Sequence, residues 1–232
     1  MLTNKVPEKD VNDLFTRVAP NYDLMNNMVS LGIQNIWRKQ FLTRLNLKST
    51  DQCLDLCCGT GDSTIALAKK VKLVTGLDFN QAMLKLAHEK IVKKHLQPKV
   101  KLVNGDAMNL PFAARSFDCV TICFGLRNVP DAEKTIKEAY RVLKPGGQFA
   151  ILEMSQPNNQ IIKLGWRAYF EIFPYWAKLV KSNVRDYQYL SKTSKEFISA
   201  QQLKQLLVKN GFSHVAVKKL TGGAAAIHIG IK

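Results

Sequence analysis

The stretch Gln52-Cys-Leu-Asp-Leu-Cys-Cys-Gly-Thr-Gly-Asp62 indicates how the rest of the chain is arranged. An apolar run broken by one carboxylate, Asp55, leads directly into the turn Gly59-Thr60-Gly61, and a helical pattern follows over 63–70. A strand that ends in a tight glycine turn and opens a helix offers free backbone N–H groups to an anionic or nucleoside-bearing ligand. We therefore expect the first strand of an α/β sheet here, with a ligand at its carboxyl end.

Two acids narrow the choice of ligand. Asp55 lies in a strand expected to be buried, where a carboxylate is costly unless a partner such as a cationic ligand group satisfies it. Asp78 ends a second apolar run, nineteen residues after Gly59, where an acid can hydrogen-bond ribose hydroxyls. The dinucleotide fingerprint is incomplete, because Thr64 stands where its third glycine would be. A nucleoside with a positive, amino-acid-like end fits both acids, which predicts S-adenosylmethionine; a glycine turn with helix-capping acids is the alternative.

Strands and helices alternate along the rest of the chain. The patterns predict strands over 72–77, 99–104, 117–124, 148–154, 213–220 and 224–231, and helices over 80–94, 131–143 and 199–210, with a stop and turn at 144–147. This alternation implies parallel βαβ units that end in an antiparallel pair. We expect an α/β fold with a mostly parallel seven-stranded sheet, helices on both faces and an antiparallel C-terminal strand, in one domain over 1–232.

Two helical segments flank the expected sheet. The lead-in, 1–50, is predicted to be mostly helical with one loop at the polar turn formers of 21–27, and to cover the cofactor as a lid or to dock on the sheet. The insertion, 156–198, contains a segment, 161–180, with six aromatic side chains and spaced cations. That segment fits a helix at a membrane interface and is too polar to span one. A cover over a lipid-tail pocket and ordinary core packing are the alternatives.

Composition favours a globular protein with a basic surface. The 232 residues are 46% hydrophobic and 22% charged, without a long apolar run or a signal-like N-terminus, so we expect a cytoplasmic protein. The five cysteines are expected to be reduced packing residues, and no metal site is expected. The net charge is +16, and 156–232 holds 12 basic against 3 acidic residues. A solvated surface, nucleic-acid binding and peripheral attraction to an anionic membrane all fit this excess.

The expected strand ends bring further polar residues together. Asp106 follows the third strand and Arg127 follows the fourth. Because parallel strands bind ligands at their carboxyl ends, one cleft is expected to hold these two residues together with 55–61 and Asp78.

Several motifs resemble a known enzyme family. Asp-Leu-Cys-Cys-Gly-Thr-Gly-Asp (55–62), Gly-Asp-Ala-Met-Asn-Leu-Pro-Phe (105–112) and Arg-Val-Leu-Lys-Pro-Gly-Gly (141–147) resemble the class I S-adenosylmethionine methyltransferases, whose fold is Rossmann-like. More narrowly, Val-Ala-Pro-Asn-Tyr-Asp-Leu-Met-Asn (18–26), Phe-Gly-Leu-Arg-Asn-Val-Pro (124–130), Leu-Glu-Met-Ser-Gln-Pro (152–157), Tyr-Gln-Tyr-Leu (187–190) and the tail 221–232 resemble the menaquinone/ubiquinone-biosynthesis C-methyltransferase family, over nearly the whole chain.

The resemblance implies a set of cofactor contacts. These are Thr60 in the glycine turn, Asp78 at the ribose, and Asp106 with Ala107 at the adenine, with Phe79 against its face and Cys123 as a weaker contact. The strand-and-turn pattern itself adds Asp55, Gly59 and Gly61 to the expected cofactor contacts.

The resemblance also implies methyl transfer from the sulfonium to a ring carbon of a quinol. Loss of a hydroxyl proton makes the ortho carbon nucleophilic. Arg127 is the candidate for phenolate stabilisation, with an ion pair to an acid such as Asp106 as the alternative. Tyr22 and Asp23 are candidates for a base or a water-mediated relay, or for anchoring a loop, and Asn128 for orienting a ligand. Cys-Cys before Gly59 resembles menaquinone-only bacterial members, so we expect lipophilic demethylmenaquinol as the substrate.

Other functions fit parts of the sequence. The charge would suit a nucleic-acid methyltransferase, but the Asn/Asp-Pro-Pro-Tyr-like segment and the Pro-Cys nucleophile of such enzymes are absent, so no nucleic-acid partner is expected. A benzoquinol or dual-specificity enzyme, a methyltransferase of another lipid or small molecule, and a cofactor-binding protein without catalysis remain alternatives, since a fold does not set its substrate. The sequence leaves the oligomeric state open.

Overall fold

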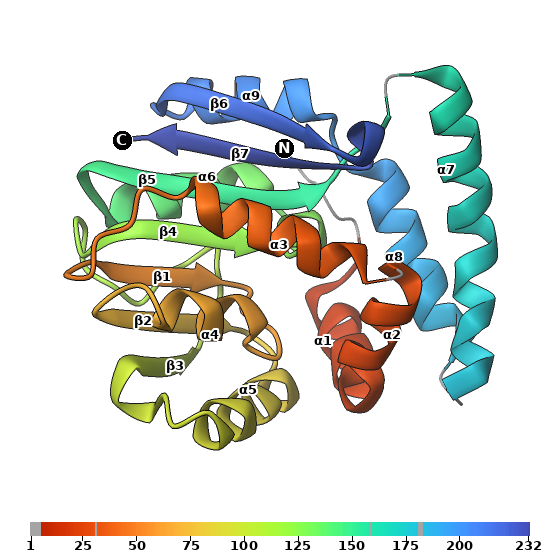
Figure 1. Ribbon diagram of the computed structural model, residues 1–232, viewed down its shortest axis with the longest axis horizontal. Helices are drawn as coiled ribbons and strands as arrows, with labels where there is room; N and C mark the ends of the chain where they lie inside the picture. Colours follow the sequence, from red (N-terminus) through yellow and green to blue (C-terminus); the bar gives the residue numbers. More distant parts are fainter. Residues whose placement is uncertain (1–5, 31, 158, 181–182) are drawn as a thin grey trace.

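The computed structural model describes residues 6–30, 32–157, 159–180 and 183–232, built around a seven-stranded sheet (Figure 1). The strands are β1 (Gln52–Leu56), β2 (Leu73–Asp78), β3 (Val100–Asn104), β4 (Phe117–Cys123), β5 (Leu143–Met154), β6 (Ser213–Leu220) and β7 (Ala225–Ile231). They are ordered β3-β2-β1-β4-β5-β7-β6, and β7 runs antiparallel to its neighbours β5 and β6. The predicted mostly parallel sheet with an antiparallel C-terminal strand is confirmed.

The helices begin largely where the sequence supplies caps. They are α1 (Glu8–Val18), α2 (Tyr22–Ser30), α3 (Ile33–Arg44), α4 (Asp62–Ala68), α5 (Gln81–Lys93), α6 (Ala132–Val142), α7 (Gln160–Ile172), α8 (Val184–Glu196) and α9 (Ala200–Lys209), with short 3-10 segments that include η3 (Leu126–Asn128), η4 (Phe173–Val180) and η5 (Thr221–Gly223). Asn80 and Asp131 accept the N–H groups that open α5 and α6, and Ser199 with Gln202 forms a capping box on α9. In the described part of the chain, no helix is both long and apolar enough to cross a membrane.

Each face of the sheet carries its own hydrophobic core. Leu54 and Leu56 of β1 pack with residues of α6 and α9, while Cys53 packs on the other face with residues of α3 and α4. Figure 1 shows α3 and α4 crossing the front of the sheet, with α6 and α9 behind it. Strands buried on both faces read as continuous apolar runs, and such runs located them in the sequence. The five cysteines are free thiols, as predicted. Cys53 and Cys119 lie within these cores, and Cys57 and Cys123 pack against them.

A third core closes the carboxyl ends of the parallel strands. Helices α1, α2, α7 and α8 meet there with Met83 of α5, around the buried side chains Met25, Phe170 and Tyr187. In Figure 1 these helices stand to the right of the sheet, where the arrowheads of β1, β4 and β5 point. The lead-in and the insertion, far apart in sequence, therefore share one core above the strand ends.

Two local predictions were wrong. The polar stretch 21–27 is not a loop but most of α2, because Met25 is fully buried in the third core and sets a helical register. The turn predicted at 144–147 lies inside β5, where Leu143 already pairs with Phe117. The pairing of β4 with β5 is irregular here, because one β4 residue between Phe117 and Cys119 lies opposite the four β5 residues 144–147. Gly146 in this bulge has a φ of +77°, which glycine adopts without strain.

The contact between Gly125 and Cys57 gives a stability test. A Cβ added at Gly125 would overlap the Cβ of Cys57, which follows β1 and has a φ of +50°. We expect Gly125→Ala to lower the free energy of unfolding by about 1–3 kcal/mol in urea denaturation, as overpacking does. The added change Cys57→Gly should restore most of the loss, since it removes the opposing Cβ and suits the positive φ.

Gly165 in α7 is the matched control. No atom outside its local helix backbone, in the described part of the chain, lies within 4 Å of a Cβ placed there. Gly165→Ala is therefore expected to stabilise the protein by up to about 1 kcal/mol. Equal stability of Gly125→Ala and wild type would contradict the close packing of the two strand ends.

Candidate active site

Two cavities meet at the carboxyl ends of the strands. The larger has a volume of about 280 Å³ and lies among α2, α3, the glycine turn, η3, α7 and α8. The smaller, about 70 Å³, lies among α1 and the ends of β1, β2 and β3. Residues that line both are Tyr22, Cys57, Gly59, Cys123 and Phe124. A ligand in the smaller cavity can therefore reach directly into the larger one.

The smaller cavity gathers most residues predicted to contact a nucleoside. Asp78, Phe79, Asp106 and Ala107 all line it, and so does Asn128, which was predicted to orient a ligand. The Asp78 carboxylate accepts hydrogen bonds from the backbone N–H of Gly59, at 2.8 Å, and of Asn80, at 2.9 Å. Burial raises the pKa of Asp78 to about 6, although these hydrogen bonds favour the ionised form. An acid at the end of β2 with apolar surface beside it fits a ribose and a base.

Asp55 is fully buried at the end of β1 and lines the larger cavity. Its carboxylate accepts hydrogen bonds from the hydroxyls of Thr64, at 2.6 Å, and Thr121, at 2.8 Å. Burial raises the pKa of Asp55 to about 6. The sequence predicts a ligand cation as the partner of this carboxylate. The two threonines occupy one acceptor site on each oxygen and leave further sites for such a group.

Gly61 lies beside the site and has a structural role. It precedes α4 at φ +84°, and a Cβ there would come within 3.1 Å of the Cβ of Ala87. Among the residues predicted for cofactor contact, Gly61 lines neither cavity. Its role in the geometry is to turn the chain into α4 against α5.

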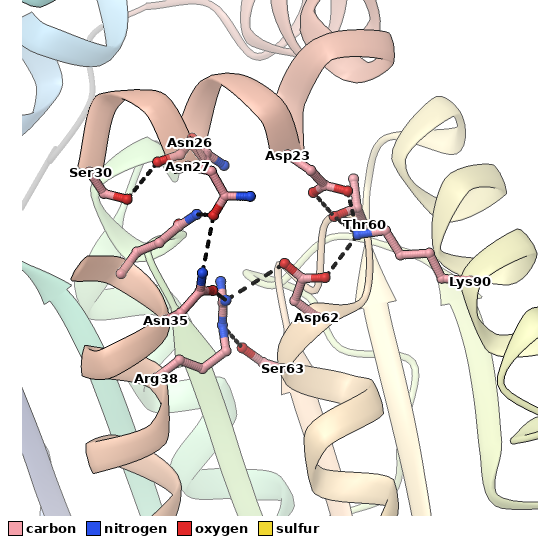
Figure 2. A network of polar contacts seen from close by, with 11 residues as sticks. Asp23, Asn26, Asn27, Ser30, Asn35, Arg38, Thr60, Asp62, Ser63 and Lys90 are labelled. Atoms are coloured by element: carbon pink, nitrogen blue, oxygen red, sulfur yellow. Dashed lines mark hydrogen bonds and ion pairs between the residues drawn. The ribbon is translucent and has the colours of Figure 1, made fainter. Parts of the chain in front are cut away.

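A polar cluster joins the lead-in to the glycine turn (Figure 2). The Thr60 hydroxyl donates to Asp23 of α2 at 2.7 Å, and Lys90 of α5 donates to Thr60 at 2.9 Å and to Asp62 at 2.8 Å. Lys90 also forms an ion pair with Asp23. We call these four residues the Asp23–Lys90 clamp. Asp23 lines neither cavity. Its carboxylate contacts Thr60 and Lys90, and these contacts hold α2 over the glycine turn.

Arg38 of α3 is a cavity residue that the sequence did not indicate. Its Nε donates to Ser63 Oγ at 3.2 Å, and its Nη1 donates to Asn35 Oδ1 at 3.3 Å (Figure 2). The Nη1 atom also lies 3.6 Å from Asp62 Oδ2. A guanidinium beside the glycine turn suits a carboxylate, which it can bind in a bidentate manner. Only the fold brings α3 to this place.

Arg127, which lines the larger cavity, forms a buried ion pair with Glu153 behind it. Their Nη1 and Oε1 atoms are 2.7 Å apart, and the side chains are 10% and 1% exposed. Glu153 also accepts the backbone N–H of Arg127, at 3.2 Å, and of Met154, at 2.7 Å. An ion pair was one expectation for Arg127, but the partner is Glu153, not Asp106. An acid within the apolar run 148–154 was the sequence signal that could have located it.

Tyr22 and Cys123 stand where the two cavities join. Burial raises the pKa of Tyr22, against the opposing effects of the Arg127 charge and a hydrogen bond with Asn26. Burial likewise raises the pKa of Cys123 to about 12. Both side chains are therefore protonated at neutral pH and present uncharged groups to a ligand.

The remaining wall of the larger cavity is aromatic. Trp37 of α3, Trp166, Tyr169 and Phe170 of α7, and Phe173 of η4 all line it. These side chains suit a flat apolar ring held next to the glycine turn. Among the residues that the structure describes, no group of three or more His, Cys, Asp or Glu side chains could hold a metal ion.

Comparison with known proteins agrees with this geometry. The ubiE/COQ5 methyltransferase family matches residues 3–232. A demethylmenaquinone methyltransferase of Lactobacillus johnsonii is 62% identical over 234 residues, which cover 100% of this chain and 96% of the relative. One of Lactiplantibacillus plantarum is 46% identical, over 96% of each chain.

Solved structures agree on the fold. An S-adenosylmethionine-dependent methyltransferase of Thermotoga maritima, described as a possible histamine N-methyltransferase, superposes with a TM-score of 0.70 at 20% identity, over 96% of this chain and 99% of that one. One of Aquifex aeolicus gives 0.62 at 19% identity, over 84% and 88%. The predicted class I methyltransferase fold, enzyme class and S-adenosylmethionine cofactor are confirmed. The match over residues 3–232 and the identity of the relatives together show that the chain belongs to the ubiE/COQ5 methyltransferase family.

Proposed function

We propose that the protein transfers a methyl group from S-adenosylmethionine to a ring carbon of demethylmenaquinol, which gives menaquinol. One observation carries the proposal: a cavity that suits a nucleoside opens into an aromatic cavity with a buried arginine in its wall. The names of the relatives point to the same substrate. The cofactor supplies an electrophilic methyl group on a sulfonium.

The residues present fit this cofactor in three places. In the smaller cavity, Asp78 is placed to accept ribose hydroxyls, and Phe79 and Ala107 offer apolar surface to the base. In the larger cavity, Arg38 is placed for the carboxylate and Asp55 for the ammonium of the amino-acid end. The uncharged Tyr22 and Cys123, shared by both cavities, then border the region between nucleoside and amino acid.

In the proposed mechanism, Arg127 stabilises negative charge on the quinol oxygen next to the reacting carbon. A fixed guanidinium in a water-poor site stabilises a phenolate without reorganisation. Glu153 holds the guanidinium in place and neutralises it before substrate binds, so the pair together carries no net charge. The phenolate directs electron density to the adjacent ring carbon. This carbon would bond to the methyl carbon as the methyl–sulfur bond breaks, with that electron pair staying on sulfur as a thioether, and the ring proton would then pass to water directly or through the Tyr22 hydroxyl.

The contacts support different roles for Tyr22 and Asp23. Tyr22 stands at the junction of the cavities and can donate a hydrogen bond or relay the ring proton. Asp23 accepts from Thr60 and pairs with Lys90. We therefore assign Asp23 to anchoring α2 as a lid on the glycine turn. Asn128, which lines the smaller cavity, is assigned to orienting the cofactor.

A methyl-transfer assay tests the proposed function. Labelled S-adenosylmethionine is offered with reduced demethylmenaquinol, a reduced demethoxy-benzoquinol or bulk RNA. We expect label in the naphthoquinol only. Equal labelling of both quinols would widen the substrate class to dual specificity, whereas labelling of RNA or of neither quinol would refute the substrate assignment.

Cofactor affinity should depend on pH through the two buried acids. Burial raises the pKa of Asp55 and of Asp78 to about 6, above their ordinary values, so both are largely protonated at pH 5 and ionised above pH 7. The cofactor hydroxyls and ammonium favour the ionised forms. Affinity measured by calorimetry should therefore rise up to about tenfold per pH unit for each acid from pH 5 to 6, and level off above 7.

Variants of the two acids show which carboxyl groups cause this pH dependence of cofactor affinity. Asp78→Asn and Asp55→Asn should each weaken binding at pH 7 and flatten the profile. Asp118→Asn is the control, because Asp118 lies at the opposite end of β4 beside Lys144 and outside both cavities. A profile that is flat in wild type would contradict the assignment of these acids to the cofactor.

A test of the role of Arg127 requires a variant that keeps the fold. Arg127→Ala would leave Glu153 as an unpaired buried charge, which costs about 3–5 kcal/mol. The double variant Arg127→Gln/Glu153→Gln removes both charges and keeps hydrogen-bonding groups. We expect it to bind S-adenosylmethionine with wild-type affinity and to lose methyl transfer by about 100- to 1,000-fold.

Glu153→Gln alone should keep part of the activity, because the guanidinium remains. If the double variant lost cofactor binding and methyl transfer equally, with its unfolding midpoint unchanged, Arg127 would belong to the cofactor site and not to the chemistry.

We further propose that α7 places the active site against an anionic membrane. Ile161, Leu164, Ala168 and Ile172 follow one helical stripe and are exposed, at 83% and 72% for the first two. The opposite stripe, with Trp166 and Phe170, lines the larger cavity. Figure 1 shows α7 at the edge of the molecule, beside α8. Exposed apolar residues interleaved with Lys163 and Arg167, in a chain of net charge +16, fit an interface with anionic lipid.

Vesicle sedimentation tests the membrane contact. Wild type should bind phosphatidylglycerol-containing vesicles more tightly than pure phosphatidylcholine vesicles, and added salt should weaken the difference. Ile161→Glu/Leu164→Glu should reduce binding at least tenfold, since it removes apolar contact and adds negative charge. Val208→Glu, at a 54% exposed site on α9, is the control and should cost much less. Equal losses for both variants would refute the assignment to α7.

A further inference from the structure

Asn80, which follows the end of β2, contacts three different parts of the protein. The residue is 1% exposed, and its backbone N–H donates to Asp78 Oδ1 at 2.9 Å. Its side-chain oxygen accepts the backbone N–H of Met83, at 2.9 Å, and caps α5. Its side-chain nitrogen is left to make contacts elsewhere, and these contacts are with α1.

The amide nitrogen of Asn80 connects the start of α5 to α1. It lies 2.9 Å from the backbone oxygen of Asn12, 2.9 Å from Asn12 Oδ1 and 2.8 Å from Thr16 Oγ1. Asn12 and Thr16 are one helical turn apart, so both side chains lie on the same face of α1. We call the contacts of Asn80 with these two residues the Asn80 tether.

The helix held by this tether forms a wall of the smaller cavity. Val11 and Phe15 of α1 line that cavity, each next in sequence to a residue of the tether. Both side chains are also buried in the third core. Asp78, which is proposed to accept ribose hydroxyls, lines the same cavity. Because Asn80 contacts both Asp78 and α1, it joins two walls of one cavity.

We propose that Asn80 is a positioning residue for the cofactor, because its tether holds α1 in place beside the bound nucleoside. This inference rests on the proposed function, which places the nucleoside in the smaller cavity. Asn80 itself lines neither cavity, so it acts through α1 and touches no ligand atom. Without the tether, cofactor binding has to select the conformations in which α1 is correctly placed, and the apparent affinity falls by the population of those conformations.

A second polar contact keeps α1 on the protein when the tether is removed. Arg17, in the last turn of α1, donates to Asp186 of α8 through Nη2 at 2.7 Å and through Nε at 3.2 Å. The buried apolar side chains of α1 also remain in the third core. Loss of the tether should therefore loosen the N-terminal part of α1 without unfolding the helix.

The first test is Asn80→Ser. Serine keeps a cap on α5 and lacks the amide nitrogen. We expect the Kd for S-adenosylmethionine, measured by calorimetry, to rise about 3- to 10-fold, as the loss of neutral hydrogen bonds allows. With saturating cofactor, kcat should stay within about twofold of wild type, because no group that touches the reacting atoms has changed. An equal fall in kcat and in cofactor affinity would assign Asn80 to general folding and overturn the inference.

The second test removes the tether from the side of α1. Asn12→Ala/Thr16→Val deletes the two side-chain acceptors at the surface of the helix, so it is informative even if Asn80→Ser fails to fold. It should also raise the Kd for the cofactor. Combined with Asn80→Ser it should add less than the sum of the separate effects, because both changes break the same contact. Fully additive effects would mean that Asn80 does not act through α1.

Asp13→Ala is the matched control, at an exposed position on the same helix and outside both cavities. It should leave the Kd for the cofactor at the wild-type value. A rise in Kd equal to that of Asn12→Ala/Thr16→Val would assign the effect to α1 in general and overturn the role of the tether.

The outcomes also separate this inference from the proposed function, because cofactor binding is measured without a quinol. If wild type binds S-adenosylmethionine and methylates no quinol, the substrate assignment fails, and a raised Kd in Asn80→Ser still supports the tether. An unchanged Kd in Asn80→Ser, with methyl transfer to the quinol intact in wild type, would overturn the role of Asn80 alone.

Discussion

Buried carboxylates at the strand ends are the constraint on which the site depends. Asp55 on β1, Asp78 on β2 and Glu153 on β5 are all buried, and each would be costly without partners. Two threonine hydroxyls satisfy Asp55, backbone N–H groups satisfy Asp78, and Arg127 satisfies Glu153. These partners fix the glycine turn, the start of α5 and the segment after β4. The positions of the cavity walls follow from the positions of these three segments.

The two helical additions supply the outer walls of the two cavities at this sheet edge. The lead-in reaches the glycine turn through the Asp23–Lys90 clamp, and the insertion supplies the aromatic wall. Both additions share one hydrophobic core, so their positions are coupled by packing. Helix α7 faces the larger cavity with Trp166 and Phe170 and solvent with Ile161 and Leu164.

Local patterns were sufficient to predict the sheet and much of the site. Asp55, Gly59 and Asp78 could be recognised because each lies at the end of an apolar run, where parallel strands converge. Arg38 and Trp166 could not, since they sit on helices that only tertiary packing brings to the cavity.

The prediction for 21–27 failed for a related reason. Asparagine and aspartate favour turns locally, but burial of Met25 in the third core outweighs that preference. The partner of Arg127 was also missed, because Glu153 and Arg127 are neighbours only through the pairing of β4 with β5.

The site of methylation and its dependence on the redox state of the ring test the central claim most directly. The enzyme is given carbon-13-methyl S-adenosylmethionine with either demethylmenaquinol or the oxidised quinone, and the products are examined by carbon-13 NMR. If Arg127 stabilises a phenolate, the label must appear on the ring carbon next to the hydroxyl, and only from the quinol, since the quinone has no hydroxyl group that could ionise to a phenolate. A label on oxygen, or equal product from the oxidised quinone, would contradict the mechanism.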